Sequence, residues 1–427
     1  MGSPLQKHLA KRKSGIDAGI YSVCSAHPWV VRAAAEQAVE AGSFLLVEAT
    51  SNQVNQFGGY TGMRPQAFCQ FVLKYVADAG LAAESLILGG DHLGPNPWRA
   101  KPADEAMILA EAMVAEYVQA GFTKIHLDAS MPCGGDPAQL ADEVVAQRTV
   151  QLCWAAEKAR GAGPGPIYVI GTEVPTPGGA VHSLEGLHVT SISAAAHTLA
   201  VHKRAFEERG LMEVWPRVIA LVVQPGVEFG HGAVIAYDRE KARPLADWLR
   251  SQSEDIVFEA HSTDYQLPGA YGELIEDGFA ILKVGPALTF AMREALGALE
   301  DMESELIDVE HRSNLSGVLE ETMLREPADW QSYYSGSPAD QKLLRLYSYS
   351  DRIRYYWHRP KVVAAVNRLI ANMSSMAIPE SMCSRYLPAQ YARLREGKIG
   401  GDPVSMIVDR IRDVLRIYAA ACNLHLE

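Results

Sequence analysis

The chain has 427 residues, of which 48% are apolar and 21% are charged, with a formal net charge of −12 and a pI near 5.6. This length accommodates a barrel of about 250–300 residues with an additional segment, and the acidic balance argues against a surface that binds nucleic acid or anionic membranes. The six cysteines are widely spaced without a CxxC pair, and no apolar stretch follows the basic N-terminus. We therefore expect a cytoplasmic protein with reduced thiols, no secretory signal and no membrane-spanning helix.

Short apolar runs alternate with longer segments of helical period along the first 300 residues. Each run is nearly continuous in apolar and β-branched residues, which is typical of parallel strands covered on both faces. The runs cover residues 19–24, 44–50, 86–92, 124–130, 167–174, 217–224, 256–261 and 279–284. Helices are expected between them, for example at 29–41, 103–120 and 142–160.

This alternation of strands and helices predicts an α/β fold, a closed (β/α)₈ barrel over residues 1–300. An open sheet of six or seven strands is the alternative if the weaker runs are not strands. Neither G-x-G-x-x-G nor G-x-x-x-x-G-K-[ST] follows the first predicted strand, so the nucleotide-binding α/β folds lack their usual signature.

The character of the sequence changes after residue 300. Aromatic clusters at 329–334, 346–351 and 354–357 lie among helical stretches that are separated by glycine and proline. We interpret 301–427 as a helical C-terminal extension that packs on the barrel or at a subunit interface, and not as an independent catalytic domain. The aromatic run at 354–357 is interpreted as an interface or core feature.

Ionisable and amide side chains follow most of the apolar runs, at the strand ends where a barrel of this kind carries its active site. An ionisable group beside a buried strand has to be solvated, paired or metal-bound, because an unpaired buried charge is strongly unfavourable. Their convergence at one end therefore predicts a functional pocket. The residues at these ends include Glu48, Asn52, Asp91, His92, Asn96, Asp128, Glu173, Gln224, His261 and Lys283.

The combination of Asp91 and His92 with Glu173 and His261 indicates a metal site. Neutral imidazoles with carboxylate oxygens suit a zinc-like divalent ion, and an open coordination position would leave room for substrate oxygens. For Asp91 the alternative is a helix N-cap.

Three further residues receive structural interpretations. His126 alternates with Asp128 and so shares its face, yet it lies further down the strand, which favours a packing role or support of a ligand from behind. His231 follows a Pro-Gly turn, and a surface-loop role is as consistent with the sequence as ligation. Asp264 is interpreted as a solvated loop charge.

Several long motifs resemble one protein family over nearly the whole chain. They lie at 47–63 (VEATSNQVNQFGGYTGM), 89–98 (GGDHLGPNPW), 126–130 (HLDAS), 171–179 (GTEVPTPGG) and 224–229 (QPGVEF). The chain thus resembles the class II tagatose-bisphosphate aldolases and, more closely, the GatZ/KbaZ subunit family.

This resemblance implies roles for the strand-end residues. Asp91 would be the catalytic acid/base, and His92 and His261 would be zinc ligands. Apart from the resemblance, we expect Asp128 at its strand end to be a second catalytic carboxylate. The third zinc histidine of the catalytic aldolases has no clean match, so Gln224, Glu173 and His231 remain candidates. The residues expected to contact substrate are Glu48, Asn52, Asn96 and Lys283.

Phosphate binding is not expected from the loops after the last two predicted strands. The catalytic aldolases hold phosphate there with glycine-rich loops whose backbone N–H groups bind anions. In this chain the glycines are missing, Asp264 would repel phosphate and Pro286 removes an N–H donor.

Three functions are compatible with the resemblance. The first is a non-catalytic subunit that supports a separate class II tagatose-1,6-bisphosphate aldolase subunit in tagatose, galactitol or N-acetylgalactosamine catabolism, with homo-oligomerisation expected. The second is an independent metal-dependent aldolase or 4-epimerase that acts on a ketohexose, a hexuronate or their phosphates. The third is a tagatose-6-phosphate kinase, although no phosphate-cradling motif for ATP is present.

Overall fold

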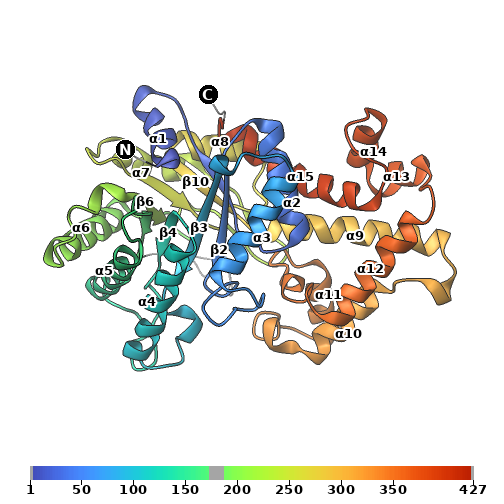
Figure 1. Ribbon diagram of the computed structural model, residues 1–427, viewed down its shortest axis with the longest axis horizontal. Coiled ribbons are helices and arrows are strands. Elements are labelled where there is room, and N and C mark those ends of the chain that lie inside the picture. Colours follow the sequence, from blue (N-terminus) through green and yellow to red (C-terminus); the bar gives the residue numbers. More distant parts are fainter. Residues whose placement is uncertain (1–2, 173–186, 425–427) are drawn as a thin grey trace.

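The fold is a closed parallel barrel, in a computed structural model that describes residues 3–172 and 187–424. Among these residues, eight parallel strands close in the order β1-β10-β9-β6-β5-β4-β3-β2, with helices around them (Figure 1). The predicted (β/α)₈ barrel is therefore confirmed, and the open-sheet alternative is wrong.

The barrel strands match the eight predicted apolar runs. Their bounds are β1 Ile20–Val23, β2 Leu45–Thr50, β3 Leu86–Leu93, β4 Lys124–Leu127, β5 Ile167–Ile170, β6 Val218–Val223, β9 Val257–Ala260 and β10 Phe279–Val284. A small antiparallel pair, β7 (Glu228–Phe229) with β8 (Val234–Ile235), follows β6. Nearly every residue of the barrel strands is buried, which explains why the runs are continuously apolar and not alternating.

Helices surround the barrel and continue beyond it. Their bounds are α1 Pro4–Ala10, α2 Pro28–Ala41, α3 Pro65–Asp78, α4 Ala103–Gln119, α5 Asp142–Ala159, α6 Ile192–Glu208, α7 Arg239–Arg250, α8 Pro268–Glu276, α9 Pro286–Leu306, α10 Leu315–Arg325, α11 Pro338–Tyr347, α12 Pro360–Ser374, α13 Glu380–Tyr386, α14 Pro388–Arg395 and α15 Pro403–Ala421. Many begin with proline in the first turn, where the missing N–H has no helical partner to lose.

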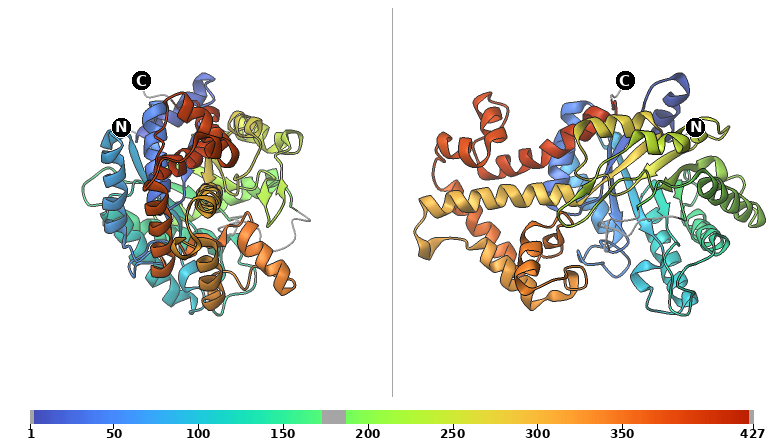
Figure 2. Two further views of the ribbon diagram at one scale, coloured as in Figure 1. Left: turned by 90° about the vertical axis from the view of Figure 1, so that its right-hand side faces the viewer. Right: turned by 180° about the vertical axis from the view of Figure 1, so that it is seen from behind.

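The C-terminal helices lie on one side of the barrel and are anchored to it at both ends. Figures 1 and 2 show α9 leaving the barrel, α10–α14 gathering beyond it, and α15 returning. Helix α15 packs against α2, α8 and α9. Residue 300 lies inside α9, so a domain division at this point would cut a continuous helix; the division remains a prediction.

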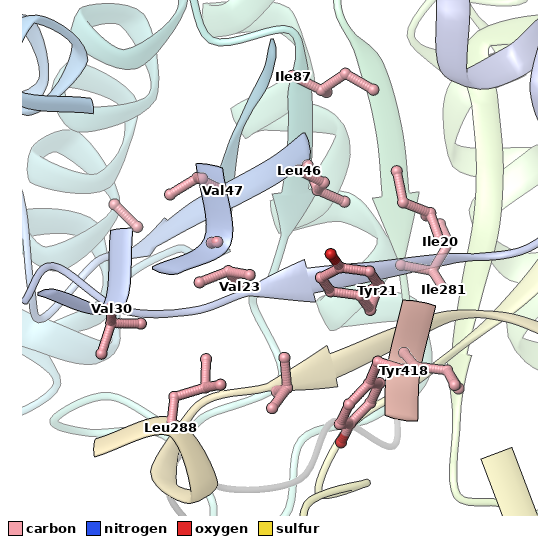
Figure 3. Close-up of a cluster of buried hydrophobic side chains, with 14 of the residues drawn as sticks. Ile20, Tyr21, Val23, Val30, Leu46, Val47, Ile87, Ile281, Leu288 and Tyr418 are labelled. Atoms are coloured by element: carbon pink, nitrogen blue, oxygen red, sulfur yellow. The ribbon is translucent and has the colours of Figure 1, made fainter. Parts of the chain in front are cut away.

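The core continues from the strands into α15. Figure 3 shows Tyr418 of α15 beside Tyr21 of β1, among apolar side chains of β1, β2 and β10. The two tyrosine rings lie 6.0 Å apart, and the Tyr418 hydroxyl is 3.0 Å from the hydroxyl of Thr263 in the loop after β9. The C-terminal helix thus contacts the loop after β9, at the carboxyl end of the barrel strands.

The opposite end of the barrel is covered by α1. The side chain of His8 is hydrogen-bonded to the carbonyl of Gly19, just before β1, and Gln6 donates to the carbonyl of Pro216, just before β6. No helix in the described ranges combines the length and the apolar character needed to cross a membrane.

Candidate metal centre and ligand cavity

The end of β3 departs from regular strand geometry and brings two adjacent side chains to one site. The pairing of β3 with β4 shifts register between Gly90 and Leu93, and His92 adopts a left-handed backbone with φ of 48°. On a regular strand Asp91 and His92 would point to opposite faces, but the irregularity directs both toward the barrel axis. Gly89 permits the close approach of β2, since a Cβ there would lie 2.6 Å from the Glu48 side chain.

Asp91, His92, His126 and His261 form a buried cluster at the carboxyl end of the barrel. Each offers one ligand atom, and these atoms lie within 4.8 Å of one another. The rings of His92 and His261 are 4.8 Å apart, and that of His126 is 5.1 Å from His92. Side chains from β3, from β4 and from the residue after β9 therefore come together, as expected for residues at the strand ends of a parallel barrel.

Each imidazole of the cluster is paired with a carboxylate through one ring nitrogen. The pairs are His92 Nδ1 with Asp128 Oδ2 at 2.8 Å, His126 Nδ1 with Asp91 Oδ1 at 2.9 Å, and His261 Nε2 with Glu259 Oε1 at 3.0 Å. A proton on the paired nitrogen leaves the other nitrogen with a free lone pair. This arrangement is the usual support of metal-binding histidines.

The cluster fits a divalent metal ion. Within the described ranges, His126 Nε2 is buried and has no hydrogen-bond partner, a state that costs free energy unless a ligand is bound there. His126 Nδ1 lies 3.2 Å from the His92 backbone N–H as well as near Asp91, but a proton on Nδ1 is favoured because its lone pair would otherwise face the carboxylate. Three nitrogen ligands and a carboxylate oxygen are the donor set of zinc sites.

A layer of buried ion pairs lies beneath the cluster. Lys283 Nζ is 2.7 Å from Glu48, 2.9 Å from Asp91 and 3.3 Å from Glu259. Lys124 Nζ is 2.7 Å from both glutamates, and its side chain is fully buried. The two lysines and the glutamates therefore balance one another in the barrel interior, where single charges would be prohibitive.

This network sets the charge state of the site. Burial raises the pKa of Asp91, but His92, Lys283 and His126 outweigh burial and hold that pKa well below its usual value. Burial lowers the pKa of His261 to about 4. Asp91 is therefore an anion and His261 a neutral imidazole at pH 7, which are the states in which both bind a cation.

A cavity of about 500 Å³ opens above the cluster. Its floor includes Asp91, His92, His261 and Lys283, and Asn52 lies on its wall. This volume is within the range of pockets that enclose small organic ligands. His27, before α2, also lines it.

The C-terminal segment supplies the other side of the cavity. Arg354, Tyr355, Trp357 and His358 line it together with Asn367 of α12. The aromatic run at 354–357, interpreted above as an interface or core feature, is therefore also part of the cavity wall.

The structure places the expected catalytic and substrate residues at different depths. Asn52 and Lys283 line the cavity, whereas Glu48 lies beneath it in the ion-pair layer. Asp128 lies behind His92 and also accepts from the Ser130 hydroxyl at 2.6 Å, so it orients the imidazole and does not face the cavity. Asn96 lies in the 3₁₀ turn Asn96–Trp98, outside the described lining.

Two candidates for the third metal ligand are not brought to the cluster. Gln224 Oε1 accepts hydrogen bonds from the backbone N–H groups of Gly226 and Val227, so it stabilises the turn after β6. His231 is hydrogen-bonded to Ser348 and to the carbonyl of Tyr333. Glu173 lies outside the described residues. His126 lies in the cluster with Asp91, His92 and His261.

Asp264 is buried, so its interpretation as a solvated loop charge is wrong. Its Oδ1 accepts from the backbone N–H groups of Gly285 at 3.0 Å and Ala287 at 2.8 Å, at the N-terminus of α9. Burial raises the pKa of Asp264 to about 6, although these N–H groups lower it. A carboxylate of the chain thus occupies donors that could otherwise bind a phosphate.

The sequence analysis gave His126 only a packing or supporting role and assigned no individual role to Lys124 or Arg354. Side chains alternate between the two faces of a strand, so Lys124, His126 and Asp128 lie on the same inward face of β4. This alternation could have placed His126 and Lys124 in the barrel interior once Asp128 was assigned to it. Arg354 had no comparable signal, because its position depends on how the C-terminal segment folds back onto the barrel.

Comparison with known proteins agrees with this architecture. Residues 5–423 match the model of the D-tagatose-1,6-bisphosphate aldolase subunit GatZ/KbaZ-like family. The chain is 51% identical over 416 residues to the D-tagatose-1,6-bisphosphate aldolase subunits GatZ of Escherichia coli O9:H4 (strain HS) and Escherichia coli (strain K12), covering 97% of this chain and 99% of each relative. It is 49% identical to a probable tagatose 6 phosphate kinase from Sinorhizobium meliloti 1021, whose crystal structure superposes with a TM-score of 0.88 over 95% of this chain and 100% of that chain. The chain therefore belongs to the D-tagatose-1,6-bisphosphate aldolase subunit GatZ/KbaZ-like family.

Proposed function

We propose that this chain is a cytoplasmic GatZ/KbaZ-type subunit that supports a separate class II tagatose-1,6-bisphosphate aldolase subunit in ketohexose catabolism. The observation that carries this proposal is the 51% identity to subunits of that name over 97% of the chain. The similarity extends through the C-terminal segment, so it includes both walls of the cavity.

The test is reconstitution with a class II tagatose-bisphosphate aldolase catalytic subunit. Adding the purified chain should raise the rate of tagatose-1,6-bisphosphate cleavage and the thermal stability of the catalytic subunit, and size-exclusion chromatography should show whether the chain alone is a homo-oligomer. No stimulation at any molar ratio, with both proteins folded, would contradict the proposal.

We also propose that the chain binds a divalent ion, zinc being the best match to its ligands. His92, His126 and His261 would give nitrogen ligands, and Asp91 would give an oxygen; Glu173 stays a further candidate. The support is the pairing of each imidazole with a carboxylate and the partnerless His126 Nε2.

Metal analysis of purified variants tests this assignment. His92→Ala, His126→Ala and His261→Ala should each lower the zinc content. His197→Ala is the matched control, since His197 lies on the exposed face of α6 with a side chain that is 53% exposed. Stoichiometry equal to wild type in all three cluster variants would remove the ligand assignment.

A second function, independent metal-dependent ketose 4-epimerisation or aldol chemistry, is favoured by the contact of the cluster with the cavity. Asp91 is a carboxylate on the cavity floor, so in this second function it would accept a proton from a substrate hydroxyl and not bind the ion. Lys283 holds Asp91 in its charged form. A bound divalent ion would supply polarisation of a substrate carbonyl.

The two functions are separated by assays of the chain alone. Ketose 4-epimerisation and tagatose-1,6-bisphosphate cleavage should be measured with and without EDTA, and with Asp91→Asn. Activity that EDTA and Asp91→Asn both abolish would establish the second function. An inactive chain that still stimulates the catalytic subunit would leave the first function alone. The kinase assigned to the Sinorhizobium meliloti relative by name is tested by ATP consumption in the same samples.

A further inference from the structure

The cavity holds one guanidinium, that of Arg354, which forms no ion pair with a described carboxylate and which Asp351 and Asp264 reach only at longer range. The cations that line it within the described ranges are Lys283 and Arg354, besides histidines. Lys283 lies within 3.3 Å of three carboxylates. No Asp or Glu in the described part of the chain forms an ion pair with Arg354, whose hydrogen bonds go to neutral groups.

These neutral contacts fix the position of the Arg354 guanidinium and use only some of its N–H donors. Nη1 donates to the carbonyls of Ser350 and Asp351, and Nη2 donates to the Tyr355 hydroxyl at 3.0 Å. Of the five N–H donors of a guanidinium, Nε–H and one hydrogen on Nη2 meet no acceptor among the described residues. These two nitrogens form one edge of the planar group, and such an edge matches two oxygens of a carboxylate or phosphate.

The segment that carries Arg354 is anchored to the barrel. Asp351 accepts from the Thr289 hydroxyl of α9 at 2.5 Å and pairs with Arg293 at 3.0 Å. On the other side, the ring of Tyr355 lies edge-on to that of Tyr60, 4.9 Å away, in the loop after β2. The guanidinium is thus held against the barrel before any ligand binds, which reduces the entropy lost on binding.

We propose that Arg354 binds an anionic terminus of the ketose, a phosphate or a carboxylate, on the wall of the cavity formed by the C-terminal segment. The inference rests on the proposed ketose function and adds the side chain that would bind the charged terminus of that ketose. It assigns that charge to the Arg354 side chain and not to the backbone N–H groups at the N-terminus of α9, because Asp264 takes those donors. A half-buried guanidinium without an ion-pair partner gains most from a ligand that supplies one.

Three ketoses that differ at one terminus test this inference by calorimetric titration. D-tagatose, D-tagatose 6-phosphate and D-tagaturonate are titrated into the full-length wild type, into Arg354→Gln and into Arg354→Lys. Arg368→Gln is the matched control, because Arg368 is exposed on α12 next to Asn367, which lines the cavity. Inorganic phosphate serves as a competitor for the charged site.

The expected result is tighter binding of one charged ketose than of D-tagatose in wild type and in Arg368→Gln. Arg354→Gln should lower that advantage roughly 10- to 100-fold, as for loss of a hydrogen bond to a charged group, and should change the affinity for D-tagatose much less than the affinity for the charged ketose. Preference for the phosphate or for the uronate identifies the source of the anion. Arg354→Lys, which keeps the charge without the planar edge, should lose part of the advantage and carries the test if Arg354→Gln does not fold.

Two outcomes overturn the inference in distinguishable ways. If wild type binds D-tagatose as tightly as both charged ketoses, or if the advantage survives in Arg354→Gln, the role of Arg354 is refuted while the ketose site stands. If no ketose binds to wild type, the ketose site itself is refuted, and the inference with it.

Discussion

Replacing Lys283 by methionine should destabilise the fold strongly and in a pH-dependent way. Lys283 Nζ lies within 3.3 Å of Glu48, Asp91 and Glu259, and all four side chains are at most 6% exposed. Burial lowers the pKa of Lys283, but the three carboxylates raise it well above its usual value. Methionine keeps most of the volume and removes the charge, leaving Lys124 as the remaining lysine of the layer.

The size of the effect follows from the cost of the orphaned charge. Removing one partner of a buried ion pair costs about 3–5 kcal/mol. The loss cannot exceed the free energy needed to protonate one of the orphaned carboxylates, because protonation removes the unpaired charge. For a glutamate at pH 7 this protonation costs about 4 kcal/mol, since the ordinary pKa is about 4.3 and each pH unit is worth about 1.4 kcal/mol. At pH 5 the same protonation costs about 1 kcal/mol. The loss should therefore be near 4 kcal/mol at pH 7 and should shrink toward pH 5.

Urea unfolding at pH 5 and pH 7 measures this difference in the free energy of unfolding. The control is Lys101→Met, because Lys101 pairs with Glu105 at 3.3 Å with side chains 49% and 60% exposed, and an exposed pair of this kind contributes at most about 0.5 kcal/mol. Adding Glu48→Gln to Lys283→Met should recover part of the loss through coupling of the two sites. A loss below about 1 kcal/mol at pH 7, or one that is equal at both pH values, would refute the reasoning.

Two further substitutions test the geometry around the site. Gly94→Ala should abolish folding or lower the free energy of unfolding by more than about 3 kcal/mol, because a Cβ there would lie 1.6 Å from the backbone oxygen of Asp128. The control is Gly297→Ala in α9, where nothing lies within 4 Å of the added Cβ; it should raise the free energy of unfolding by about 0.5–1 kcal/mol in the same assay. Equal changes in stability for the two variants would contradict this prediction. Asp264→Asn should remove a pH dependence, since a folded-state pKa of about 6, above the ordinary value, means that wild type loses stability as pH rises from about 4 to 6. The variant should therefore gain about 3 kcal/mol relative to wild type between pH 4 and pH 7, and parallel stability curves would show that Asp264 has an ordinary pKa.

The barrel could be predicted from the sequence because burial on both faces makes each strand continuously apolar. The run 279–284 has the same bounds as β10, and most others end within two residues of the observed strand. The run 124–130 continued too far, since β4 ends at Leu127 and the polar residues after it turn toward β3, where Asp128 N–H donates to the Leu93 carbonyl. Hydrophobicity marks where a strand is buried, whereas the hydrogen-bond ladder decides where it ends.

The cluster of Asp91, His92, His126 and His261 was predicted in part, because its formation depends on local backbone geometry as well as on strand order. Asp91, His92 and His261 stand at strand ends, where the chain order alone brings side chains together. That the neighbours Asp91 and His92 reach the same point depends on the left-handed backbone at His92. Depth along β4 argued against His126, but barrel strands are tilted and staggered, so a position further down one strand can lie level with the end of the next.

The sequence by itself determined the family, the parallel barrel and the polar strand ends, because these depend on local composition and on the order of strands along the chain. Tertiary structure decided that Asp264 occupies the N-terminus of α9 and that Arg354 joins the cavity. Both outcomes depend on contacts between segments far apart in the sequence, and hydrophobic periodicity carries no information about which polar partner such a segment meets. Gln224 differs, because it stabilises a local turn by accepting from residues two and three positions later.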